Sequence, residues 1–141
     1  FWCPEMVNIA DHNNTKVFRY ADAILMMAEC YLELDDTDNA MRYLNMVKDR
    51  AQIARYETFK NYDHLHEEIE RERARELFGE FQRKYDLVRW GSWYRQTFDY
   101  TDYKSLQDNI LPCHEYYPIP DKEVTYSGNA LDNDAYAEWG L

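Results

Sequence analysis

The clearest pattern of apolar and polar positions lies between residues 19 and 34. Apolar residues recur there at the three- and four-residue spacing of one helix face, at Ile24, Met27, Ala28 and Tyr31. This pattern predicts an amphipathic helix from Arg19 to Leu34, with Asp22 in its first turn, where the helix dipole favours a negative charge. Cys30 and Leu34 widen the stripe, so Cys30 is expected to be a buried thiol.

A second helical pattern follows a polar turn. The turn runs from Asp35 to Asn39 and is rich in residues that cap helices. The face after it carries Ala40, Tyr43, Leu44, Val47 and Ala51. Two helices joined by so short a turn should pack antiparallel. Ala28 and Ala40 would let them approach closely, as in a tetratricopeptide-like unit. Such a unit normally needs neighbours, and the chain holds no second copy, so we expect that part of the protein is missing.

The pattern then predicts a long third helix from Asp63 to Tyr85, capped by Asn61 or Asp63. Gly79 is a weak point inside it, where a kink or a close approach is expected. A short helical turn from Asp86 to Trp90 should end at Gly91.

No convincing period appears from Ser92 to Tyr117, although this segment is rich in aromatic residues. A loop of this length is usually functional or held by something outside it. The sequence Pro118-Ile119-Pro120 predicts an extended path, and Ser127-Gly128-Asn129 predicts a turn before a polar irregular end. The expected class is therefore mostly α, with an irregular aromatic-rich C-terminal segment.

Composition narrows the possible functions. A chain of 141 residues suggests one domain, and 16% of its residues are aromatic. The formal net charge of −11 disfavours nucleic acid, because an acidic surface repels a phosphate backbone. No apolar run approaches the length of a membrane span. In an exported protein, Cys3 and Cys113 could form a disulfide.

The candidates for catalysis and metal binding are weak. Glu72, Glu76 and Glu80 share a helix face, which would allow acid/base work on a glycosidic bond, but neighbouring arginines would pair with them equally well. His64 and His66 are two residues apart and do not share a helix face, so a structural or surface role outweighs a metal site. The chain has no phosphate-binding glycine loop and no serine nucleophile elbow, so we expect no cofactor, no metal and no catalytic residue.

Four stretches, in order, resemble the signature of the SusD/RagB family. They are Arg19–Glu29, read as R-Y-A-D-A-I-L-M-M-A-E; Leu44–Ala51, read as L-N-M-V-K-D-R-A; Glu72–Gly91, which contains E-R-A-R-E-L-F and R-K-Y-D-L-V-R-W-G; and Pro118–Glu123, read as P-I-P-D-K-E. Two departures stand out. The family's F-E-G is Phe78-Gly79-Glu80 here, and its closing Q-N-P-G-Y is Asp132-Asn133-Asp134-Ala135-Tyr136.

The resemblance implies that residues 1–141 are the C-terminal portion of a SusD-like protein. The N-terminal part, signal peptide and lipobox of that protein would lie outside this chain. Members are surface-exposed outer-membrane lipoproteins that serve nutrient uptake and polysaccharide utilization in Bacteroidetes. The resemblance implies binding of starch-type oligosaccharides or polysaccharides, no catalysis, and a SusC-like TonB-dependent transporter as partner. Membrane attachment would come only from a lipid anchor outside the chain, and Cys3 is not the lipidated residue.

Two sets of residues are singled out, one by the density of rings in the segment without period and one by helix spacing together with the family pattern. The aromatic residues expected to contact glycan or partner are Trp93, Tyr94, Tyr100 and Tyr103, because flat amphipathic rings stack on sugar rings. Arg73, Glu76, Arg83, Asp86 and Arg89 are expected to form an internal salt-bridge network that links the third helix to the Asp86–Trp90 turn. The alternative function is a helical-repeat scaffold that binds protein and no sugar.

Overall fold

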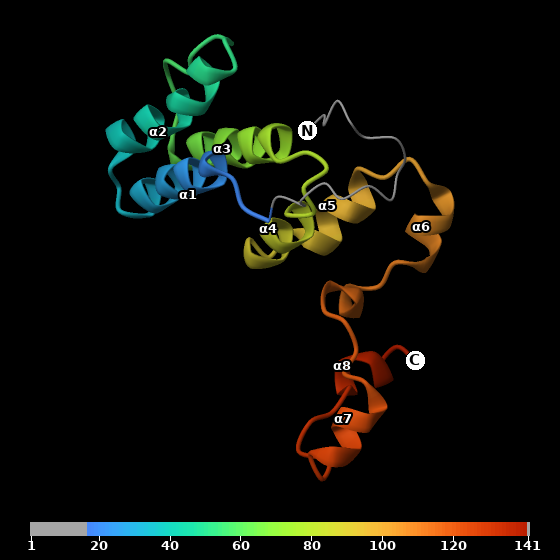
Figure 1. Ribbon diagram of the computed structural model, residues 1–141. Coiled ribbons are helices and arrows are strands. Elements are labelled where there is room, and N and C mark those ends of the chain that lie inside the picture. The colour runs from blue at the N-terminus through green and yellow to red at the C-terminus, as the bar shows by residue number, and fades with distance from the viewer. Residues whose placement is uncertain (1–16, 141) are drawn as a thin grey trace, which may run out of the picture. The chain divides into compact units, whose positions relative to one another are not determined.

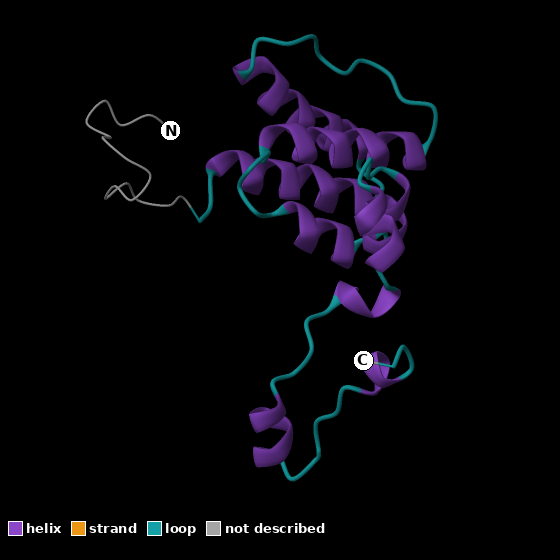
Figure 2. Cartoon of the chain, turned by 90° about the vertical axis from the view of Figure 1, so that its right-hand side faces the viewer, coloured by secondary structure: helices purple, strands orange, loops and turns teal. Residues whose placement is uncertain are grey.

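The computed structural model describes residues 17–140, and within that range the chain forms helices and no strand (Figures 1 and 2). The helices are α1 (Tyr20–Glu33), α2 (Thr37–Arg50), α3 (Tyr62–Glu76), α4 (Arg83–Arg89), α5 (Trp93–Asp99), α6 (Lys104–Asn109), the 3₁₀ helix η1 (Pro112–Glu115), α7 (Asp121–Tyr126) and α8 (Asp134–Ala137). The chain divides after Arg83 into two compact units, of which residues 17–83 and 84–140 are described. The expected mostly helical class is confirmed.

The first unit is a three-helix assembly around an aliphatic core. α1 and α2 are joined by a short turn and pack side by side, and α3 contacts both (Figure 1). The core residues are at most 1% exposed; they are Leu25, Ala28, Leu32, Ala40, Leu44, Val47, Leu65 and Ile69. Ala28 and Ala40 are both fully buried, as expected of small residues in a tetratricopeptide-like helix pair.

The buried face of α1 is rotated from the predicted stripe. Leu25 and Leu32 are fully buried, whereas Met27 and Leu34 are 39% and 75% exposed. The prediction of a buried Cys30 thiol was wrong, because Cys30 is exposed. The reason lies in tertiary packing: the residues facing α2 and α3 are Ala21, Leu25, Ala28 and Leu32, which also recur at helical spacing.

The two predicted helix starts that depend on capping are present. The Asp36 side chain accepts a hydrogen bond from the Asn39 N–H at 3.1 Å at the start of α2. The Asn61 side chain accepts one from the His64 N–H at 3.0 Å at the start of α3. Each satisfies a backbone donor that has no partner within its helix.

The predicted long third helix was wrong in its length, since α3 ends at Glu76 and a turn separates it from α4. Gly79 adopts a left-handed conformation with φ of 76°, and Phe81 has φ of 62°. Glycine takes this conformation without a steric penalty, so Gly79 suits the turn that follows the helix, where a kink had been expected.

The second unit begins with short helices packed on a small core. α4 ends at Arg89, and the predicted Gly91, whose φ is 64°, lies in the turn that follows it. Leu87, Trp93 and Ile110 form the core and are 7–8% exposed. The expectation of an irregular segment from Ser92 to Tyr117 was wrong, because it contains α5, α6 and η1. Helices of six or seven residues contain fewer than two turns and leave no readable period in the sequence.

The C-terminal tail is held by the side chains of Asn133 and Tyr136. The Asn133 side chain accepts a hydrogen bond from the Ile119 N–H at 2.8 Å and donates one to the Ile119 carbonyl at 2.9 Å. The Tyr136 hydroxyl donates to the Tyr116 carbonyl at 2.5 Å. These bonds tie the predicted extended segment, Pro118–Pro120, to α8, although the closing motif lacks the proline and glycine of the family pattern. The predicted turn also forms, with Gly128 at φ 67°.

Candidate functional site: paired charges and exposed tyrosines

A buried ion pair joins α1 to α3. Arg73 Nη2 lies 2.9 Å from Asp22 Oδ1, and both side chains are at most 5% exposed. Asp22 was expected to interact with the dipole of its own helix, and the structure adds the Arg73 guanidinium as its partner. A charge at this depth needs a partner, because removing it from water without one costs several kcal/mol. The pair therefore fixes the position of α1 on α3.

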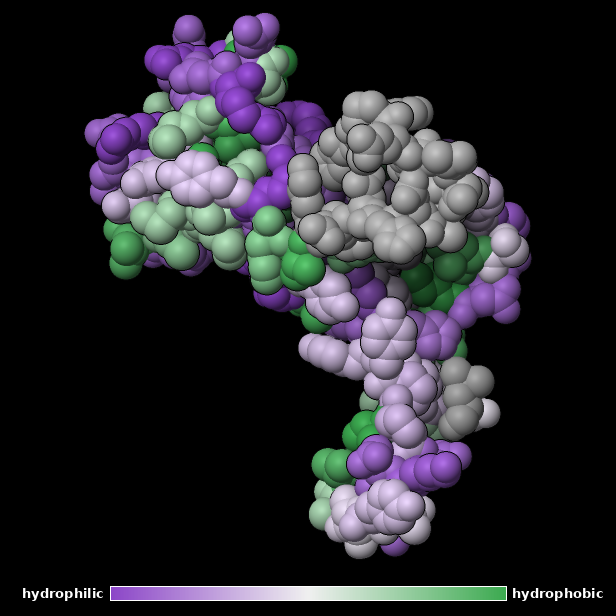
Figure 3. All heavy atoms as spheres, viewed as in Figure 1, coloured by the Kyte–Doolittle hydropathy of each residue, from purple (hydrophilic) through white to green (hydrophobic). Residues whose placement is uncertain are grey.

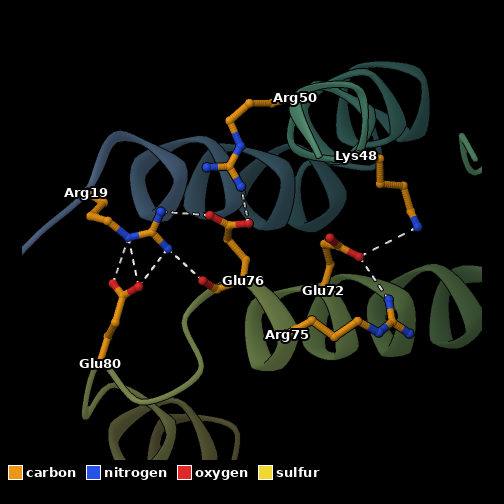
Figure 4. A network of polar contacts seen from close by, with 7 residues as sticks. All are labelled: Arg19, Lys48, Arg50, Glu72, Arg75, Glu76 and Glu80. Carbon is orange, nitrogen blue, oxygen red and sulfur yellow. Dashed lines mark hydrogen bonds and ion pairs between the residues drawn. The ribbon is translucent and has the colours of Figure 1, made fainter. Parts of the chain in front are cut away.

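A second group of charges surrounds Arg19, at the start of α1 (Figure 4). Its Nε lies 2.8 Å from both carboxylate oxygens of Glu80, and its Nη1 lies 2.8 Å from Glu76 Oε1. Its Nη2 donates to the Glu76 carbonyl oxygen at 2.6 Å. Arg50, from the end of α2, pairs with the same Glu76 carboxylate. The hydrogen bond to Glu80 contributes most to raising the pKa of Arg19.

Glu72 is the third carboxylate of this helix region. It is buried and lies 2.9 Å from Arg75 and 3.6 Å from Lys48 of α2 (Figure 4). Each of the three glutamates that could have served acid/base chemistry thus faces at least one cation. A catalytic carboxylate pair would face a substrate space from two sides. The arrangement of Glu72, Glu76 and Glu80 is that of structural ion pairs between helices.

The predicted salt-bridge residues take different partners in the two units. Arg73 binds Asp22, and Glu76 binds Arg19 and Arg50, as described above. In α4, Asp86 is 5% exposed and accepts a hydrogen bond from Arg89 Nε at 3.1 Å. Arg83 is partly buried at the start of α4. A link from α3 to α4 through these side chains stays a prediction. The partners on α1 and α2 were missed, because only the tertiary fold brings them near α3.

The two histidines of α3 have local partners. The His64 ring lies 3.2 Å from the Tyr56 hydroxyl and accepts the Lys60 N–H at 3.2 Å. His66 lies 3.3 Å from Glu70 and stacks on Tyr62, with ring centroids 5.9 Å apart. Among residues 17–140, no three His, Cys, Asp or Glu side chains gather as metal ligands would. Cys113 is buried, and its proposed partner Cys3 lies outside the described residues.

The four predicted aromatic contact residues differ in exposure. Trp93 is 8% exposed in the core of the second unit, and the Lys84 ammonium lies 5.2 Å from its ring centroid. Tyr94 is half-buried and stacks on Phe98 at 5.9 Å. Tyr100 and Tyr103 are 82% and 75% exposed. The expectation for Trp93 is corrected accordingly: its ring packs on protein and offers no free face to a ligand.

Further exposed tyrosines, absent from the predicted set, follow along the chain. Tyr116, Tyr117 and Tyr126 are 66–80% exposed. Lys84 lies 3.9 Å from the Tyr117 ring centroid and donates to the His114 carbonyl at 3.2 Å, so this ring already has a cation on one face. The segment's aromatic density was a usable signal, but the sequence could not separate the rings that fill the core from those that face solvent.

The geometry defines the class: a helical scaffold with a tetratricopeptide-like helix pair and an aromatic C-terminal region. The family model described as "SusD family" matches residues 6–136. The chain belongs to the SusD family, and the predicted membership is confirmed.

Two relatives illustrate the similarity. The SusD-like protein P25 of Formosa agariphila is 40% identical over 128 residues, which cover 87% of this chain and 24% of that protein. The crystal structure of a SusD superfamily protein from Bacteroides vulgatus matches with a TM-score of 0.70 and 33% identity, over 79% of this chain and 25% of that one. The chain thus spans about a quarter of the length of either relative. No helix among residues 17–140 is long and apolar enough to cross a membrane.

Proposed function

We propose that this chain belongs to a non-catalytic glycan-binding protein of the outer-membrane surface. The protein captures starch-type oligosaccharides or polysaccharides and passes them to a SusC-like TonB-dependent transporter for uptake. Membership of the SusD family supports the glycan-binding class. The proposal also includes attachment by a lipid anchor outside residues 1–141, and the placement of this chain in the C-terminal portion of the protein.

The observation that carries the proposal is the exposure of Tyr100 and Tyr103. Tyr100 directly follows α5 as its C-cap, and Tyr103 directly precedes α6 as its N-cap. Two helix ends therefore hold the backbone of both rings, which limits the entropy lost when a ligand binds. A tyrosine ring offers an apolar face to a sugar ring and a hydroxyl to its polar rim.

The charged groups support a non-catalytic role. Glu72, Glu76 and Glu80 are each bound by arginine or lysine, and each lies in or beside α3. These pairs place the carboxylates against cations of the protein, whereas a catalytic pair would face a substrate from two sides. The proposed protein therefore binds glycan and leaves its bonds intact.

Affinity electrophoresis against a panel of polysaccharides tests the proposal. The variant Tyr100→Ala/Tyr103→Ala, made in the longest polypeptide that the gene encodes, should lose about tenfold in affinity, which corresponds to about 1.4 kcal/mol. Its melting temperature should not change, because neither ring contributes to the core. Tyr126→Ala, which removes a ring that is 80% exposed on α7, is the matched control and should bind as wild type. Equal retardation of wild type and double variant would contradict the proposal.

The same gels separate the second candidate, a helical scaffold that binds protein. The complete burial of Ala28 and Ala40 between α1 and α2 favours it, because this close crossing is typical of repeat scaffolds. Such a scaffold should migrate unchanged in gels with every polysaccharide.

A further inference from the structure

An apolar surface lies at the end of the first unit where α1 begins and α3 ends. We name it the Phe78 surface. Its side chains are 67–88% exposed; they are Val17, Phe18, Tyr20, Phe78 and Phe81. The core of the unit is complete without them, since its eight residues are at most 1% exposed. Figure 3 shows hydrophobic residues of this unit at the surface beside hydrophilic ones.

Polar contacts hold the two halves of the Phe78 surface together. Arg19 lies between Phe18 and Tyr20 in the chain and binds Glu76 and Glu80 (Figure 4). These two glutamates precede and follow Phe78 in the sequence. The Gln82 side chain donates to the Val17 carbonyl at 3.3 Å. Side chains from both segments therefore form the surface, and these polar contacts hold the two segments next to each other.

The backbone of the turn adds an independent observation. Phe81 has φ of 62°, a left-handed conformation that is uncommon for a bulky residue and costs energy. Its side chain is nonetheless 86% exposed, so no packing within the first unit offsets that cost. Strained backbone that holds an apolar ring in solvent is more typical of a contact site than of a simple connection.

The surroundings suit an apolar partner. The chain has a net charge of −11, yet the carboxylates beside Phe78 are matched by Arg19 and Arg50. A partner that covers this surface would not have to desolvate an unpaired charge. Proteins rarely leave so many large apolar side chains together in solvent unless something covers them.

We propose that the Phe78 surface is the contact by which the rest of the full-length protein packs onto the first unit. The length of the relatives supports this occupant over a second copy, because about three quarters of either relative lies outside the stretch that matches this chain. The covering segment presents apolar side chains that receive the Phe78 and Phe81 rings. This contact uses none of the tyrosines proposed to bind glycan, and the proposal stands whether or not they do.

Hydroxyl-radical footprinting read by mass spectrometry tests the proposal. Oxidation of Phe78 and Phe81 is compared between the 141-residue chain and the longest polypeptide that the gene encodes. We expect about tenfold slower oxidation in the longer polypeptide, because a covered ring loses nearly all of its contact with water. Tyr100 and Tyr103, as internal controls, should oxidise at similar rates in both.

A variant gives the second readout. Phe78→Ser/Phe81→Ser should lower the melting temperature of the longer polypeptide and leave that of the 141-residue chain unchanged. Leu34→Ser, which changes an apolar side chain that is 75% exposed at the opposite end of α1, is the control in both. Equal oxidation in the two polypeptides, or an unchanged melting temperature of the longer variant, would overturn the proposal. Protection that depends on protein concentration would indicate a second copy instead and would also overturn it, as would a gene that encodes no further residues.

Discussion

The two units of this chain differ in how completely they bury their cores. The first unit buries eight aliphatic residues almost completely and ties its three helices with paired charges. The second unit has a core of three residues that remain 7–8% exposed, and it leaves Tyr100, Tyr103 and other tyrosines largely in solvent. The difference indicates a division of labour in which the first unit supplies the more rigid core and the second unit supplies the tyrosines proposed to contact glycan.

The largest expected effect comes from the buried pair of the first unit. Asp22→Asn keeps the shape of the side chain but removes the buried carboxylate charge that faces Arg73, so we expect a loss of about 3–5 kcal/mol in the free energy of unfolding. Urea unfolding followed by circular dichroism measures it. Asp38→Asn, which is also in the first turn of a helix but exposed, is the matched control and should change stability little. A small effect of Asp22→Asn would show that the pair does not hold α1 to α3.

Leucine truncations compare the two cores directly. Leu44→Ala in the first unit should lower the free energy of unfolding by about 3 kcal/mol, since the side chain is fully buried and rigid neighbours would leave a cavity. Leu87→Ala in the second unit should cost less, because a smaller core can collapse around the gap. Three of the four tryptophans, Trp90, Trp93 and Trp139, lie in the second unit, so most of the tryptophan fluorescence reports on it. Equal costs would contradict the contrast between a rigid and a loose core.

The smallest effect concerns a contact at the edge of the first unit. The Tyr62 hydroxyl donates a hydrogen bond to the Glu33 carboxylate, and this bond contributes most to raising the pKa of Tyr62 to about 12. Because the folded-state pKa lies above the ordinary value of 10.0, the bond stabilises the fold fully below pH 10 and ceases to do so as the pH rises toward 12.

Ultraviolet titration of the phenolate absorbance checks this prediction. The difference between wild type and Tyr62→Phe isolates the Tyr62 transition, which should have its midpoint near pH 12. Glu33→Gln should move that midpoint down. A Tyr62 midpoint that Glu33→Gln leaves unchanged would show that the carboxylate is not the cause.

Helical period and capping residues predicted the parts of the fold that depend on local sequence. The α1–α2 pair, the Asn61 cap and the stop at Gly91 are all local features, and all are present. Gly79 indicated a weak point near the break after Glu76. The residues on both sides favour helix, so the sequence predicted one continuous helix. The short helices of the second unit were missed because they contain fewer than two turns.

The candidate sites were less predictable, since they depend on which segments meet. The sequence marked Arg73 and Glu76 as needing partners, but those partners lie on α1 and α2, more than twenty residues away along the chain. The aromatic segment was correctly singled out as dense in rings. Its division into a buried Trp93 and exposed Tyr100 and Tyr103 follows from packing that no local pattern encodes.

Hydrogen exchange with and without glycan tests the division of labour most directly. The measurement compares backbone amide protection in the longest polypeptide that the gene encodes, using an oligosaccharide that it retains in affinity gels. The account predicts that glycan slows exchange at residues 100–107, where Tyr100 and Tyr103 lie, and leaves α1, α2 and α3 unchanged. Protection confined to the Glu72–Glu80 region, with none at residues 100–107, would contradict it.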